Sequence, residues 1–166
     1  MLVAAINQSS GIYKFVLVLH IFAAIIGFGS VLLNGVYAAH ARRRPGPEGA
    51  AIADANYDVS FGWAMWFIYA VVVLGLALVG MSDKAWKFSQ TWVWLSLVLW
   101  FALVGLVHGV HRPNVRQLDA LVGSGSGDVA EMERRGRLAS TMGAVLSLIV
   151  VVSLVLMVFK PGAPGS

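Results

Sequence analysis

The residues best suited to chemistry in this sequence of 166 residues are its four histidines. His20 lies inside a long apolar run, whereas His40, His108 and His111 lie where apolar runs give way to arginines. An imidazole can ligate a metal ion or a haem iron, and it can equally form a hydrogen bond between two helices. Each histidine therefore has a binding interpretation and a structural one.

Three of the histidines cluster near one predicted membrane boundary. The motif "HGVHRP" places His108 and His111 three residues apart, which puts both on one face of an α-helix. Together with His40 they give three imidazoles that could hold zinc or copper. The alternative is contact with lipid head groups and loop carboxylates. His20 lies roughly 20 Å from His108 along the helix axes, so we do not expect these two to share one metal ion.

His20 also belongs to a polar stripe in the first apolar run. Tyr13, His20, Gly27 and Asn34 recur every seven residues and so share one helix face. Polar groups in a membrane helix need partners in the protein, which makes this the inner face of the helix. In the structural interpretation, His20 and Asn34 form hydrogen bonds with serines of later helices, namely Ser96, Ser147 and Ser153. In the functional interpretation, His20 binds a cofactor, either haem b or copper.

The composition shows which elements must position these residues. Hydrophobic residues make up 58% of the chain and charged residues 12%, a balance typical of membrane proteins. The apolar residues fall into four blocks of spanning length, at about 11–39, 61–81, 89–110 and 138–159. Backbone groups in lipid must be satisfied within a segment, which requires helices. The sequence therefore predicts an all-α membrane protein, with residues 1–166 forming a single domain, an antiparallel bundle of four transmembrane helices.

The basic residues predict the orientation of this bundle. Eight arginines flank or lie in the first and third connections, and four lysines lie on the other side of the membrane. Basic loops are retained in the cytoplasm, so we expect loops 1 and 3 to be cytoplasmic and both termini extracytoplasmic, in a bacterial plasma membrane. The net charge of +4 is then explained by lipid head groups, and no nucleic acid partner is expected.

The two long connections differ in character. The first, residues 41–60, contains Pro45, Pro47 and many small residues, which predicts an irregular segment on the membrane surface. The third contains "GSGSGD", a composition typical of a flexible joint. Asp128 and Glu131 then provide a helix start, so we expect the fourth helix to begin in water and to enter the membrane without a break.

Two stretches carry a family resemblance. The opening "YKFVLVLHIFAAIIGFGSVLLNGVYAAHARRR" and the close "STMGAVLSLIVVVSLVLMVFKPG" resemble an uncharacterised family of predicted bacterial integral membrane proteins. The first run, with a lysine before a leucine–histidine pair and glycines two turns later, is distantly similar to the copper-resistance D membrane domain and to HemJ-type protoporphyrinogen oxidases. In the HemJ-type enzymes the first-span histidine is associated with haem, and the resemblance implies that role for His20.

These observations favour a small, non-catalytic accessory or cofactor-handling subunit of a bacterial membrane system. Its expected partners are the lipid bilayer and other membrane subunits or a second copy of itself. One alternative is a haem-dependent membrane oxidoreductase that uses His20. Another is the passage of copper or another metal along the histidines. No aspartate or glutamate lies within the four apolar runs, which disfavours a proton-driven transporter.

Overall fold

The computed structural model describes residues 8–44, 46–124 and 128–163, and every regular element in these ranges is helical. In chain order the elements are α1 (Gly11–Arg42), α2 (Pro47–Asp58), the π-helical turn η1 (Val59–Trp63), α3 (Ala64–Gly80), α4 (Thr91–Leu106), the π-helical turn η2 (Val107–His111), α5 (Arg112–Ser124) and α6 (Val129–Phe159).

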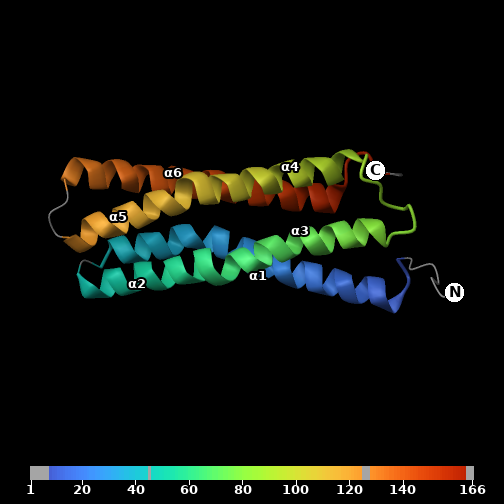
Figure 1. The fold of residues 1–166 in the computed structure, drawn as a ribbon, viewed down its shortest axis with the longest axis horizontal. Helices are drawn as coiled ribbons and strands as arrows, with labels where there is room; N and C mark the ends of the chain where they lie inside the picture. The colour runs from blue at the N-terminus through green and yellow to red at the C-terminus, as the bar shows by residue number, and fades with distance from the viewer. Residues whose placement is uncertain (1–7, 45, 125–127, 164–166) are drawn as a thin grey trace.

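Four long helical rods form the bundle. Helices α2, η1 and α3 join into one rod, α4, η2 and α5 into another, and α1 and α6 are the remaining two. Each rod contains 31 to 34 residues and is apolar enough to cross a membrane, so the prediction of four transmembrane helices is confirmed. Figure 1 shows the rods side by side, with the start of α1 and the end of α6 at the same end of the bundle.

The rods are longer than a membrane requires. At 1.5 Å per residue each is on the order of 50 Å long, against a hydrocarbon core of about 30 Å. The surplus lies at the end opposite the termini, where α2, α5 and the first turns of α6 are rich in polar residues (Figure 1). We call this end the polar extension.

The prediction of an irregular first connection is wrong, because residues 47–58 form helix α2. Pro47 occupies the first turn of that helix, where backbone N–H groups have no partner within the helix, so the N–H that proline lacks is not needed. The alanines that follow favour helix. The rod that covers the expected span at 61–81 begins at Pro47. The rod that covers the expected span at 89–110 continues through α5 to Ser124.

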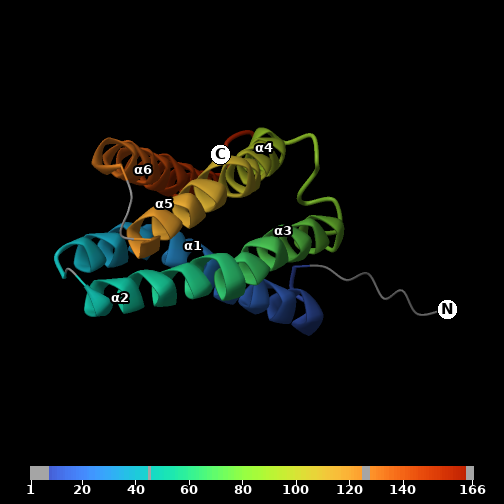
Figure 2. The same cartoon turned by 60° about the vertical axis from the view of Figure 1, so that its left-hand side comes forward.

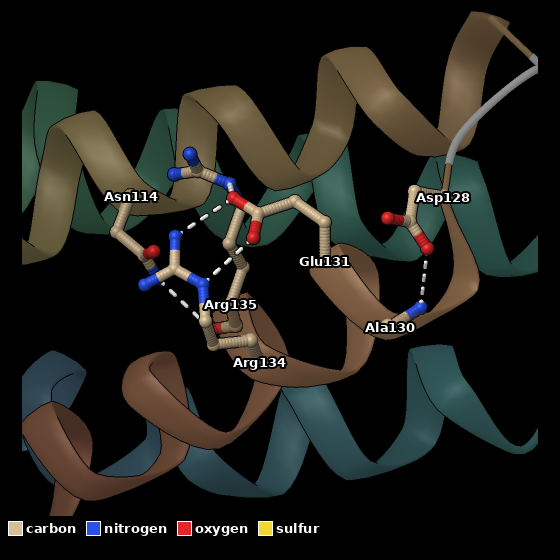
Figure 3. Close-up of polar contacts among 6 residues, drawn as sticks. All are labelled: Asn114, Asp128, Ala130, Glu131, Arg134 and Arg135. Carbon is tan, nitrogen blue, oxygen red and sulfur yellow. Dashed lines mark hydrogen bonds and ion pairs between the residues drawn. The ribbon is translucent and has the colours of Figure 1, made fainter.

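The start of α6 was predicted correctly. The Asp128 carboxylate accepts a hydrogen bond of 2.9 Å from the Ala130 N–H, and the helix then runs unbroken to Phe159. Figure 3 shows Glu131 between Arg134 and Arg135, each with its Nε 2.7 Å from a Glu131 oxygen. The predicted flexible joint falls mainly on residues 125–127, outside the described residues.

The rods associate in two pairs. Helix α1 packs along α3, and α4 packs along α6, as Figure 2 shows. Gly27 lies at a close approach of the first pair, since a Cβ built there would be 3.1 Å from the Ile68 backbone nitrogen. The buried core lies between the pairs, midway along the bundle, and includes Ile68, Leu103 and Val150.

Candidate functional site

A chamber of about 590 Å³ lies between the two helix pairs. It runs from the middle of the bundle toward the end that carries the termini, and residues of α1, α3, α4 and α6 line it. Most of these residues are apolar. The volume falls within the range of about 300–1,000 Å³ that is typical of sites for small molecules and cofactors. The chamber is therefore the principal candidate binding site.

His20 lies in the wall of this chamber and crosses from α1 to α3. Its Nδ1 donates a hydrogen bond of 2.9 Å to the Val71 carbonyl oxygen. A carbonyl can only accept, so Nδ1 carries the proton and Nε2 carries a lone pair. Nε2 forms no hydrogen bond with any described residue. A neutral imidazole held in this way can ligate a metal ion or accept a hydrogen bond from a hydroxyl group.

Gly75 makes room for the imidazole. A Cβ built on Gly75 would be 3.2 Å from Cε1 of His20 and 3.6 Å from its Nδ1. The absence of a side chain one turn after Val71 thus lets the ring reach the Val71 carbonyl. This glycine is a positioning residue for His20, a role that the sequence pattern did not predict.

The two serines in the chamber wall are already satisfied by their own helices. The Ser96 hydroxyl donates to the Trp92 carbonyl at 2.6 Å, and the Ser153 hydroxyl donates to the Ile149 carbonyl at 2.8 Å. His20 instead bonds the Val71 carbonyl, and Asn34 bonds Asn56 and His111, which differs from the expected bonds to Ser96, Ser147 or Ser153. Because the hydroxyl protons are engaged, His20 is the main polar group that a ligand deep in the chamber would meet.

Aromatic residues and one cation line the outer end of the chamber. The ammonium of Lys160 lies 4.2 Å from the ring centroid of Trp86 and 5.9 Å from that of Trp92. Trp86 also donates a hydrogen bond of 3.3 Å to the hydroxyl of Tyr13. Tryptophan and tyrosine are typical of the membrane interface, and a lysine there can attract an anionic group.

A second polar cluster lies between the two π-helical turns. Asn56 donates through Nδ2 to Oδ1 of Asn34, and Asn34 lies 3.2 Å from Nε2 of His111. Ser60 donates to Oδ1 of Asn56 at 3.3 Å. The cluster joins α1, α2, η1 and η2. Each of these side chains bonds to another member of the cluster, and Nδ1 of His111 has no partner among the described residues.

The structure does not bring the three candidate metal ligands together. His40 accepts a bond of 3.2 Å from Arg44, His108 lies 2.6 Å from the Tyr69 hydroxyl, and His111 is buried against Asn34. No group of three histidine, cysteine or acidic side chains in the described residues could hold a metal ion. In this structure the three histidines make three separate contacts, and a metal site formed by them stays a prediction.

The π-helical turn η2 explains why His108 and His111 do not share one helix face. An extra residue in the turn at 107–111 separates His108 from His111, so that His108 is exposed while His111 is 3% exposed.

The residues of the predicted stripe on α1 all lie against other parts of the bundle. Tyr13 and Gly27 are buried, and His20 and Asn34 both bond to other helices. Asn56 and Ser60 were missed. Their spacing of four residues would have indicated a shared helix face had the first connection been predicted as helical.

Four apolar spanning helices with a polar extension define an integral membrane protein. The comparisons agree: residues 14–161 match the family described as "Predicted integral membrane protein (DUF2269)", and the chain belongs to that family. They give no support for similarity to the copper-resistance D domain or to HemJ-type enzymes. No curated protein and no solved structure matches the chain.

Proposed function

We propose that this protein is a non-catalytic, cofactor-handling protein of the bacterial plasma membrane, and that it holds a lipophilic cofactor in the chamber. The observation that carries the proposal is the chamber of about 590 Å³ within the apolar part of the bundle, with His20 in its wall. The chamber is open on one side, where lining residues such as Ile25 and Val158 are exposed, so a lipophilic molecule could enter it from the membrane and cover its apolar wall.

The residues present define the ligand's chemistry. The apolar wall suits a hydrocarbon body, and Nε2 of His20 would accept a hydrogen bond from a hydroxyl group or ligate a metal centre. Lys160 at the outer end would suit an anionic group. Among the described residues no carboxylate lines the chamber, so it lacks a partner for acid–base chemistry with His20. These features support holding a ligand rather than converting it.

The second candidate is a haem-dependent oxidoreductase, which the His20 geometry favours. Histidines that ligate metals generally donate their other ring N–H to a carbonyl or carboxylate, as His20 does to Val71. No second histidine lines the chamber among the described residues, so a haem here would have one imidazole ligand. Passage of copper along the histidines is less favoured, because His40, His108 and His111 have separate partners.

Extraction of the purified protein tests the proposal. The protein would be purified in mild detergent and extracted with organic solvent, and the extract compared by mass spectrometry with a lipid extract of the same membranes. We expect one lipophilic compound enriched to near one per chain. An extract with only the phospholipid mixture of the membrane would contradict the proposal. A Soret band in the visible spectrum of the same sample would favour the haem-dependent oxidoreductase over the proposed function.

A further inference from the structure

A second, much smaller cavity adjoins the buried polar cluster. Its volume is about 20 Å³, and it lies where α1, η1, η2 and α6 meet. The polar residues in its wall are Ser30, Asn34, Ser60 and His111. A cavity needs a volume of about 10–15 Å³ to hold one water molecule, together with two to four polar partners. This cavity meets both conditions.

The hydrogen bonds of the cluster determine the protonation of His111. Asn56 donates to Oδ1 of Asn34, which identifies the other end of the Asn34 amide as its NH₂ group. That NH₂ group therefore donates to Nε2 of His111 at 3.2 Å. In a neutral imidazole one nitrogen accepts and the other carries the proton. The proton of His111 is thus on Nδ1.

Nδ1 of His111 has no acceptor among the described residues, although the side chain is 3% exposed. A buried N–H without a partner is rare in native proteins and costs the free energy of its lost hydration. The cavity beside the imidazole also offers acceptors, since the hydroxyl oxygens of Ser30 and Ser60 keep lone pairs after donating to Gly27 and Asn56.

We infer that this cavity is a binding site for a single water molecule, which accepts the Nδ1–H of His111 and donates to the serine hydroxyls in the cavity wall. The water completes a directed chain from Ser60 through Asn56 and Asn34 to His111. It is a permanent component of the bundle at the base of the polar extension. The inference is independent of any ligand in the large chamber.

Gly143 provides the test, because it lines the cavity and a Cβ built there meets no atom within 4 Å. Gly143→Ala would place a methyl group in the cavity without a clash and displace the water. The matched control is Gly136→Ala, seven residues earlier in α6, where an added Cβ also meets nothing. Thermal unfolding in detergent would be measured for each variant and for each in a His111→Leu background.

We expect Gly143→Ala to unfold at a lower temperature than Gly136→Ala, because the water is lost and the His111 N–H is left without a partner. In the His111→Leu background the difference should disappear. A Gly143→Ala variant as stable as Gly136→Ala would show a dry cavity and overturn the inference. An equal decrease in both backgrounds would also overturn it. If His111→Leu does not fold, the comparison of the two alanine variants in the wild-type background decides.

Discussion

At the scale of single residues, two inward-facing histidines use their ring nitrogens in opposite ways. His20 donates through Nδ1 to a backbone carbonyl, whereas His111 accepts through Nε2 from Asn34. The sequence predicted that His20 and Asn34 would need protein partners, because polar groups are costly in lipid. It could not predict which partners, because these depend on Gly75 and on the π-helical turns.

Substitutions of His20 separate its bond to Val71 from its packing. His20→Gln keeps an N–H donor and should unfold close to the wild type in detergent. His20→Phe keeps a ring without a donor and should lose about 1 kcal/mol of stability, typical of a hydrogen bond between membrane helices. Ser96→Ala serves as the control, since that hydroxyl bonds within its own helix. Equal unfolding midpoints for the Gln and Phe variants would show that the bond to Val71 contributes no stability.

At the scale of elements, the π-helical turns decide which side chains meet. Val59–Trp63 and Val107–His111 each add a residue to a long rod and bring the rings of Phe61 and His111 to 5.5 Å. Each turn contains a glycine, Gly62 or Gly109, and Pro113 follows the second, but hydrophobic periodicity along the sequence does not distinguish a π-helical turn from α-helix. This explains why four rods were predictable while the polar cluster between two of them was not.

The packing of α1 on α3 depends on Gly27. In a Gly27→Ala variant, the new Cβ would be 3.0–3.3 Å from Ile68 and the Phe67 backbone, so these atoms must shift by a few tenths of an ångström. We expect a loss of about 1–3 kcal/mol in unfolding experiments in detergent, the usual effect of overpacking. Gly35→Ala is the control on the same helix, because its Cβ would meet nothing. Unchanged stability of Gly27→Ala would contradict this close approach.

At the scale of the whole molecule, composition alone indicated four apolar helices, because spanning length and hydrophobicity are local properties of the chain. The polar extension was hidden by Pro45 and Pro47, which suggested a break where the chain in fact begins helix α2. The chamber could not be predicted from single helices, since it depends on how far two helix pairs separate.

The arginine distribution predicts that the polar extension lies in the cytoplasm. The chain contains no cysteine, so single cysteines can report each side of the membrane. Ala51→Cys in α2 and Ser89→Cys in the α3–α4 connection are both at exposed positions. In intact cells, an impermeant thiol reagent should label Ser89→Cys and leave Ala51→Cys unlabelled until the cells are opened. The reverse pattern would invert the orientation.

The most direct test of the central claim is native mass spectrometry of the purified protein, its Gly29→Phe variant and its Gly35→Phe variant. Gly29 lines the chamber and an added Cβ there meets no atom within 4 Å, so the phenyl group would occupy the ligand's space. Gly35 lies exposed on the same helix. We predict one bound lipophilic molecule in the wild type and in Gly35→Phe, and none in Gly29→Phe. Equal occupancy in all three proteins, or a wild type without any bound molecule, would contradict a cofactor-holding chamber.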